Sequence, residues 1–508
     1  MSLTFRGFKG ALLVMLATLI FGGCAHIPDR VQGVPTTSPS AEVPWPPPSA
    51  AAQIPVQTTA PPIPIEQVRQ EHARLSLVDV VDIALRDNPA THTAWEDARA
   101  AAARYASTRG SWFPTVTLNS SLYHSKNTAP QGSTAGQPQE PITETITTAN
   151  LTYLLLDFGG RPAAVEESRQ ALLAANWNQN AVIQDIILQV EIAFFNNAGA
   201  KALLGANRTS LADAEANLAA AEERRRMGMA TGADVLQTKT AYSETLLAVQ
   251  DAEGRVRKTK GALAVAMGYP ANTTFDLETE IPAVPDVTLT QTVDELINRA
   301  LTDRPDLQAS RSVTLQARAR VKETRSRMLP TLSASGSVSR IWSGIAQGPQ
   351  RSPYSLSLLL QIPVFDGFSR QFDLMQAKTT ADAALERTRS AEQIATYQVF
   401  SAHSDFLTAG ERVKTTNDLM DSARQSEEVA LGRYKEGVGS ILDLLSAQKS
   451  LASARAEQIN SHLSWFIALA QLAHDVGILD PRGENPLVPG TWRHSSEVKH
   501  HDNNQESK

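Results

Sequence analysis

Two long stretches of this chain contain no proline, one between Pro162 and Pro270 and one between Pro363 and Pro481. Proline in a helix interior costs about 3 kcal/mol, so long segments without it are typical of long helices. Both stretches are rich in Ala, Leu, Glu, Gln, Arg and Lys, which are strong helix formers. The sequence therefore predicts long helices over both stretches.

The chain also contains an internal repeat. Residues 84–89 resemble residues 300–305 at an offset of 216, and further on Gly228 matches Gly437 at an offset of 209. A shorter loop between two strands of the second copy explains the change of offset. A period this long is not that of a solenoid. It predicts a tandem duplication, with repeat 1 over 71–290 and repeat 2 over 291–480.

Each copy opens with two predicted helices. The first is short and amphipathic, about Leu77 to Arg86 in repeat 1 and Val293 to Leu301 in repeat 2. The second starts at Pro89 or Pro305, since proline is favoured at the first position of a helix, and runs to about Arg109 or Arg327.

Four segments then alternate apolar and polar residues, which is the pattern of strands. They are 115–122, 149–153, 332–339 and 354–358. Such strands are the weak signature of a transmembrane barrel wall, and the alternative is an ordinary half-buried sheet. The loops, about 125–141 and 342–353, suit an outward-facing end. Because four strands cannot enclose a lumen, a pore would need several chains, and three chains would give twelve strands.

Short turns connect the second strand of each copy to its long helix. Their residues are Gly159 and Gly160 in repeat 1 and Asp366 and Gly367 in repeat 2. Glycine lowers the steric cost of a sharp strand-to-helix conversion. A helix of about 65 residues follows in each copy and spans roughly 100 Å.

Gly228 and Gly437 then interrupt the helical pattern, and the chain returns as a helix to about Met267 or Val476. Apolar residues recur every seven positions along this return helix, which predicts coiled-coil packing. Each copy is therefore predicted to be a mainly helical hairpin with a β-hairpin at one end.

The N-terminus has the features of an export signal. Arg6 and Lys9 precede an apolar run, and the chain's one cysteine, Cys24, follows two glycines. This arrangement resembles a bacterial lipoprotein signal at 1–23, in which Cys24 is lipidated; the alternative is an ordinary signal peptide. The resemblance implies the outer membrane as the destination. Eleven prolines between Cys24 and Ile65 predict an extended tether over 24–70, and 481–508 reads as a polar tail.

Composition excludes several classes of protein. One cysteine rules out an intramolecular disulfide framework and a cysteine-based zinc site. A net charge of -6 argues against binding of nucleic acid. The histidines have no metal-binding spacing, and no nucleotide-binding or hydrolase motif is found, so neither an enzyme nor a cofactor is expected.

The turn between the long helices of repeat 2 resembles that of the TolC-like outer-membrane factor family. The family pattern R-Y-x-x-G-x-x-S-x-L-D-L-L-x-A-Q fits residues 433–448 at every specified position. Repeat 1 is a looser version, with Arg225 in place of the tyrosine. Residues 363–367 approach the family's strand-end pattern, with the glycine one position early. The resemblance covers about residues 70–480.

This resemblance implies a homotrimer with a twelve-strand barrel in the outer membrane and a twelve-helix tunnel in the periplasm. The helix turns would form the closed periplasmic tip, where a periplasmic adaptor protein docks. An inner-membrane pump would load the conduit, and the RND type is the pump class that we expect. Residues of the turns, namely Gly228, Thr231, Gly437 and Ser440, would then serve adaptor docking.

Two aspartates at the tip have two interpretations. Asp234 and Asp443 lie three residues after Thr231 and Ser440, which predicts helix capping boxes. The family places gating aspartates here, and rings of carboxylates select cations in pores. Ser446 occupies the family's second acidic position, which puts a second ring in doubt. The nearby arginines, Arg224 to Arg226 and Arg433, are interpreted as a solvated helix face.

Three functions remain open from sequence. The first is the outer-membrane channel of a tripartite efflux pump that exports small molecules. The second is the exit duct of a type I protein secretion system, which uses the same architecture. The third is a coiled-coil lipoprotein scaffold without a pore, against which the alternating strands argue.

Overall fold

The computed structural model describes residues 30–31, 34–35, 74–126, 141–277, 283–285, 291–343 and 352–479. The chain divides into two units, residues 1–64 and 65–508. In the first unit, strands β1 (Arg30–Val31) and β2 (Val34–Pro35) pair antiparallel. Cys24, most of the predicted tether and the C-terminal tail lie outside the described residues.

The second unit contains both repeats, and its elements follow the predicted order. Repeat 1 consists of α3 (Leu77–Asp87), α4 (Pro89–Arg109), the 3-10 turn η2 (Gly110–Trp112), β3 (Thr115–Ser125), β4 (Ile142–Leu156), α5 (Gly160–Arg226) and α6 (Gly232–Ala266). Repeat 2 consists of α7 (Val293–Asp303), α8 (Pro305–Ser326), β5 (Thr331–Ser343), β6 (Tyr354–Gln361), α9 (Ser369–Lys435) and α10 (Ile441–Val476).

The two long helices confirm the prediction from the proline-free stretches. Both α5 and α9 contain 67 residues, which at 1.5 Å per residue is about 100 Å. Helix starts follow local chemistry: Pro89 and Pro305 occupy the first turns of α4 and α8, and Ser76 forms a capping box with Asp79. None of the described helices is both long enough and apolar enough to cross a membrane.

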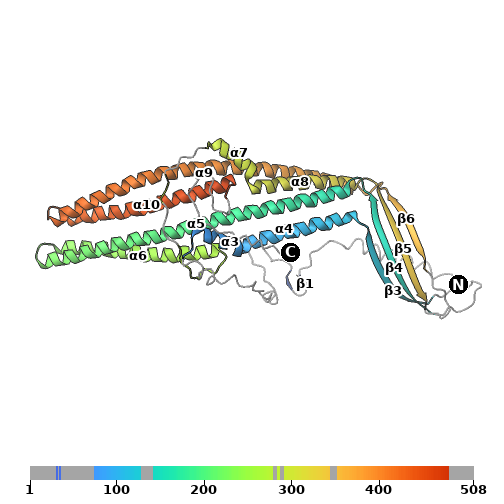
Figure 1. Ribbon diagram of the computed structural model, residues 1–508, viewed down its shortest axis with the longest axis horizontal. Coiled ribbons are helices and arrows are strands. Elements are labelled where there is room, and N and C mark those ends of the chain that lie inside the picture. Colours follow the sequence, from blue (N-terminus) through green and yellow to red (C-terminus); the bar gives the residue numbers. More distant parts are fainter. Residues whose placement is uncertain are drawn as a thin grey trace, which may run out of the picture. The chain divides into compact units, whose positions relative to one another are not determined.

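The four longer strands form one antiparallel sheet in the order β3-β4-β5-β6. The two hairpins, β3-β4 and β5-β6, join through the central pair of β4 and β5, where Leu151 lies opposite Gly336. The chain therefore leaves β3 and β6 as edge strands. Figure 1 shows the sheet at one end of the long helices.

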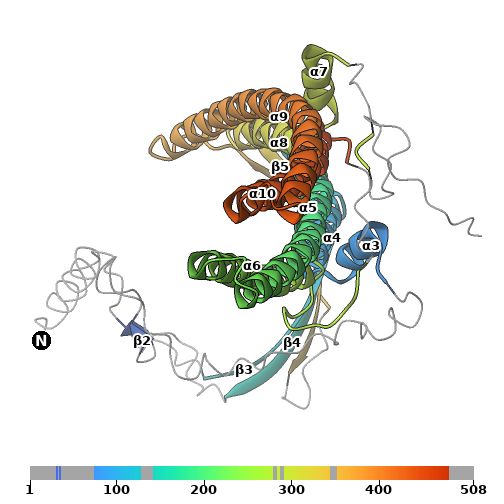
Figure 2. The same ribbon diagram turned by 90° about the vertical axis from the view of Figure 1, so that its left-hand side faces the viewer.

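The helices pack as two hairpins, α5 against α6 and α9 against α10, and α10 also packs against α5 (Figures 1 and 2). The main core lies where α3, α5, α7, α9, α10 and the end of α6 meet. Its aromatic part includes Phe195 stacked on Phe466 with ring centroids 5.1 Å apart. The predicted seven-residue stripes point inward, since Leu263, Leu444 and Leu472 are fully buried.

Candidate functional site

The sheet has one apolar and one polar face. Side chains at alternate positions of a strand point to the same face. Val116, Leu118 and Leu122 of β3 share a face with Leu356 and Leu358 of β6 through the register. These five side chains are 69 to 82% exposed in the single chain. An exposed apolar face of this size requires an apolar environment or a partner.

The opposite face consists largely of hydroxyl and amide side chains. Ser335 pairs with Ser357 at 2.7 Å, Ser337 with Ser355 at 2.8 Å, and Thr148 with Ser339 at 2.8 Å between hydroxyl oxygens. These cross-strand bonds fix the polar side chains in a ladder. The sheet is therefore suited to separate lipid on one face from water on the other.

The turns that join the second strand of each copy to its long helix are built as the sequence indicates. Gly159 has a φ of +95°, which L residues rarely adopt, and Gly367 has a φ of +68°. A Cβ atom at Gly160 would lie 2.6 Å from the Ser326 hydroxyl of α8, so close packing requires glycine there. Phe158 and Phe368 also have positive φ angles, which the sequence did not predict.

An ion pair accompanies each of these turns. Arg161 lies 3.8 Å from the Asp157 carboxylate, and Arg370 lies 3.2 Å from Asp366 at the equivalent turn. Arg161 is 9% exposed, with its guanidinium 4.6 Å from the ring centroid of Trp112. It also donates to the carbonyl of Leu155 at the end of β4. Arg161 thereby joins the strand end to the start of α5.

The other end of each long helix carries the predicted tip turn. Gly228 and Gly437 both have positive φ angles. Thr231 and Ser440 accept hydrogen bonds from the backbone N–H of Asp234 and Asp443, whose carboxylates accept in return. The capping prediction is therefore confirmed at both positions. Asp443 is exposed and Asp234 is half-buried.

Arg224 corrects one sequence interpretation. The sequence predicts a solvated helix face for Arg224, but its guanidinium lies 4.4 Å from the ring centroid of Tyr434 and donates weakly to the Tyr434 carbonyl at 3.4 Å. Arg225 and Arg226 are exposed, as predicted. The contact connects the α5–α6 hairpin to the α9–α10 hairpin. Sequence reasoning missed it because the two residues are distant in the chain.

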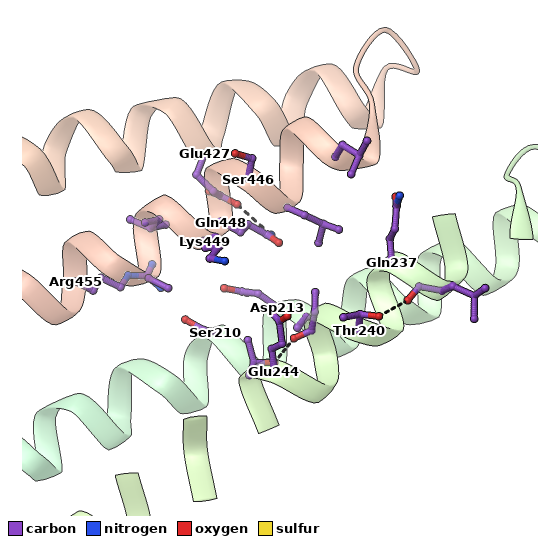
Figure 3. Close-up of a pocket in the computed structure, with 18 residues that line it drawn as sticks. Ser210, Asp213, Gln237, Thr240, Glu244, Glu427, Ser446, Gln448, Lys449 and Arg455 are labelled. Carbon is purple, nitrogen blue, oxygen red and sulfur yellow. Dashed lines mark hydrogen bonds between the residues drawn. The ribbon is translucent and has the colours of Figure 1, made fainter. Parts of the chain in front are cut away.

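A cavity of about 610 Å³ opens between the two helical hairpins, close to their tips. Figure 3 shows acidic side chains of α5 and α6 on one wall, Asp213 and Glu244, and basic side chains of α10 on the other, Lys449 and Arg455. Gln448 bridges its inner part, accepting from Asn217 at 2.7 Å. None of these four charged residues forms an ion pair within the described part of the chain. The cleft thus offers charges of both signs to a partner.

The described residues contain no group of three or more His, Cys, Asp or Glu side chains placed to hold a metal ion.

The architecture is that of bacterial outer-membrane channels. The fold matches the structure of the outer-membrane channel OprN with a TM-score of 0.71 and 22% identity, over 79% of this chain and 89% of that one. It matches the CmeC outer membrane channel of Campylobacter jejuni with a TM-score of 0.72 and 18% identity, over 79% and 85%.

The chain belongs to the outer membrane efflux protein family, whose model matches residues 80–269 and 296–477. The two matched segments fall in the two repeats. Among relatives, Protein CyaE of Bordetella pertussis is 28% identical over 76% of this chain and 80% of its own length. The solvent efflux pump outer membrane protein SrpC of Pseudomonas putida is 24% identical over 92% and 97%. The expected family is thereby confirmed.

Proposed function

We propose that this protein is the outer-membrane channel of a tripartite efflux pump, a passive conduit that carries small molecules from the periplasm to the exterior. The observation that carries the proposal is the sheet, with an apolar face, a hydroxyl-lined face and two unpaired edges. Relatives named as efflux pump outer membrane proteins support the export of small molecules.

The channel is a homotrimer. The edge strands β3 and β6 have no partner within the sheet, and unpaired edges are satisfied by pairing with another chain. Three copies of the four-stranded sheet close a barrel of twelve strands, wide enough for a lumen. The apolar face meets the outer-membrane lipid and the hydroxyl face lines the water-filled interior. The long helices continue this interior as a tunnel.

The tip is the gate of the conduit. Asp234 and Asp443 of three copies place carboxylates around the constriction, where they attract cations while also capping α6 and α10. The contact of Arg224 with Tyr434 holds the two hairpins of one chain together at the same level. Ser446 stands at the family's second acidic position and supplies no carboxylate there, so the proposed gate rests on Asp234 and Asp443.

The adaptor docks at the tip turns and in the cleft between the hairpins. Gly228, Thr231, Gly437 and Ser440 form the turn surface, and the cleft offers Lys449 and other charges for a helical partner. An inner-membrane pump of the RND type supplies the cargo through this adaptor. Lipidation of Cys24 anchors the N-terminus in the outer membrane.

Conductance in a planar lipid bilayer tests the channel and its gate together. The trimer is expected to conduct, and Asp443→Asn is expected to lower its selectivity for cations. Asparagine keeps an oxygen that accepts from the Ser440 backbone, so the helix cap survives while the charge is lost. Asp443→Ala removes both. A protein that does not conduct refutes the channel, and unchanged selectivity in Asp443→Asn refutes the gate.

The effect of deleting the gene distinguishes the efflux channel from the type I exit duct and from the scaffold. Deletion of the gene is expected to sensitise the cell to toxic small molecules. If secretion of a particular protein stops instead, with unchanged sensitivity, the exit duct of a type I system is correct. A non-conducting lipoprotein with neither effect supports the scaffold.

A further inference from the structure

The end of α10 packs on the middle of α5 through a polar junction that joins repeat 2 to repeat 1. The His474 ring of α10 lies 2.9 Å, through Nε2, from the Asp185 carboxylate of α5. Next to it, Gln184 donates its side-chain N–H to the carbonyl of Gly477 at 3.1 Å. Two adjacent residues of α5 therefore meet two positions of the α10 C-terminus.

The end of α6 in repeat 1 is built like the end of α10. Arg304, in the turn before α8, donates to the carbonyl of Asp475 at 3.1 Å. The matching residue before α4, Asn88, donates to the carbonyl of Ala266 at 2.9 Å, and Ala266 matches Asp475 at the offset of 209. Gly268 and Gly477, which also match, have φ angles of +88° and +82°. The duplicated sequence has thus kept the same backbone geometry at both helix ends.

The contact of α5 with the end of α10 has no equivalent between the matching helices α9 and α6 of the same chain. The helix that matches α5 is α9, and it does not form a packed pair with α6 in one chain; Figure 2 shows the two at opposite ends of the helical layer. The positions that match Gln184 and Asp185 are Gln393 and Ile394. Ile394 is 55% exposed, and the exposed Gln393 amide has no hydrogen bond among the described residues.

The end of α6 presents the complementary positions. Val265 matches His474 and is also 55% exposed, and the carbonyl of Gly268 matches that of Gly477. The charged pair of His474 and Asp185 is thus replaced, at both of its positions, by an apolar residue. A simultaneous change from a charged pair to an apolar pair is what two positions in mutual contact require, because a lone charge facing an apolar side chain would lose its partner.

We infer that α9 of one copy of this chain packs on the end of α6 of the next copy in the register in which α5 packs on α10. Gln393 donates to the Gly268 carbonyl of the neighbouring copy, and Ile394 packs on its Val265. The inference rests on the trimer of the proposed function. A contact between two different surfaces closes into a ring when the rotation between copies allows it.

The closed ring then contains two kinds of junction in alternation. Within each copy, repeat 1 meets repeat 2 through the charged pair of His474 and Asp185. Between copies, repeat 2 meets repeat 1 through the apolar pair of Ile394 and Val265. The duplication gives both junctions the same backbone geometry. The different side chains at these four positions distinguish the contact within a copy from the contact between copies. If His474 or Asp185 of one junction met Ile394 or Val265 of the other, the charged side chain would be left without a partner. This mismatch favours the pairing of His474 with Asp185 within a copy and of Ile394 with Val265 between copies.

Cross-linking of paired cysteines tests this register in the full-length protein in outer-membrane vesicles. The variant Val265→Cys/Ile394→Cys is treated with a short bismaleimide and separated on a denaturing gel. We expect loss of the monomer band and gain of dimer and trimer bands. Each single variant, and the parent chain with Cys24 alone, is expected to run only as a monomer band on this denaturing gel. The matched control, Asp185→Cys/His474→Cys, is expected to react within one chain and give a monomer of altered mobility.

A second variant tests the same contact without cysteine. Ile394→Asp places a charge against Val265 of the next copy, so the fraction of trimer measured by analytical ultracentrifugation in detergent is expected to fall. Adding Val265→His recreates the within-chain pair between copies and is expected to restore the trimer at pH 5. Both positions are exposed in the single chain, so the folding of each copy is preserved.

The outcomes separate the register from the assembly. If the parent protein is a conducting trimer but the cysteine pair gives no bands between chains, or Ile394→Asp leaves the trimer intact, the register is wrong and the channel stands. If the parent protein is not a trimer, the register and the proposed function fail together.

Discussion

Replacement of His474 by glutamine is expected to destabilise the protein in acid much more than in base. The His474 side chain is 17% exposed and lies between two carboxylates, Asp185 at 2.9 Å and Asp475 at 3.0 Å. Asp306 of α8 also attracts it and is itself paired with Arg304. Burial lowers the pKa of His474, but hydrogen bonds to Asp475 and Asp185 outweigh burial, and its pKa is raised.

The sign of the pH dependence follows from that direction. A histidine whose folded pKa is raised stabilises the fold fully below its unfolded pKa of about 6.5, and this contribution is lost as the pH rises through the folded pKa. The hydrogen bond to the buried Asp475 is worth about 1.5–3 kcal/mol as a charged contact. The pair with Asp185, whose carboxylate is 65% exposed, adds about 0.2–1 kcal/mol. For a chain of this size, the total corresponds to a Tm shift of about 3 °C.

Thermal unfolding followed by circular dichroism at pH 5, 7 and 9 measures this effect in the detergent-purified protein. His474→Gln is expected to lower the Tm at pH 5, with a much smaller shift at pH 9. The control is His462→Gln on the same helix, because burial lowers the pKa of His462. Its protonation opposes folding, so that variant is expected to gain stability in acid. An equal loss for His474→Gln at pH 5 and pH 9 would show that packing alone is involved.

Three further replacements test the tip and the turns. Arg224→Ala removes a cation–π contact with Tyr434 worth about 0.5–2 kcal/mol, and this contact holds the two hairpins of one chain together at the tip. Bilayer recordings of this variant should therefore show more frequent channel opening. An unchanged opening frequency would show that the contact does not keep the tip closed. Ser440→Ala removes a helix cap worth about 1 kcal/mol, which should speed hydrogen exchange in the first turn of α10 and leave the rest of the helix unchanged. If the first turn of α10 in Ser440→Ala exchanged as slowly as in the parent protein, Ser440 would not be the helix cap. Arg161→Met leaves the largely buried Asp157 without its cation and should cost about 1–3 kcal/mol in thermal unfolding, whereas an unchanged Tm would mean that the aromatic contacts alone suffice.

The sequence predicted the elements well because each rests on a local signal. The absence of proline and the glycine breakers set the limits of α5 and α9, and Pro89 and Pro305 set the starts of α4 and α8. The capping boxes at Asp234 and Asp443 are likewise contained within four consecutive residues. The chemistry of such features is complete within a short segment, so distant parts of the chain do not alter it.

Contacts between the hairpins were beyond sequence reasoning. The approach of Arg224 to Tyr434, and of His474 to Asp185, joins residues more than two hundred positions apart. Which face of a solvent-exposed helix meets another helix depends on the curvature and crossing of both, to which many weak packing contacts contribute. The cleft between the tips exists for the same reason.

By itself, the sequence determined that the chain is a duplicated unit of long helices and alternating strands, because proline, glycine and the period of apolar residues act locally. Only the tertiary structure decided how the two copies face each other. It placed a charged pair at one junction of the repeats and exposed the matching apolar residues, Val265 and Ile394, at the other. The physical reason is that a duplicated sequence repeats its backbone geometry, whereas the burial of each copy depends on the neighbour that covers it.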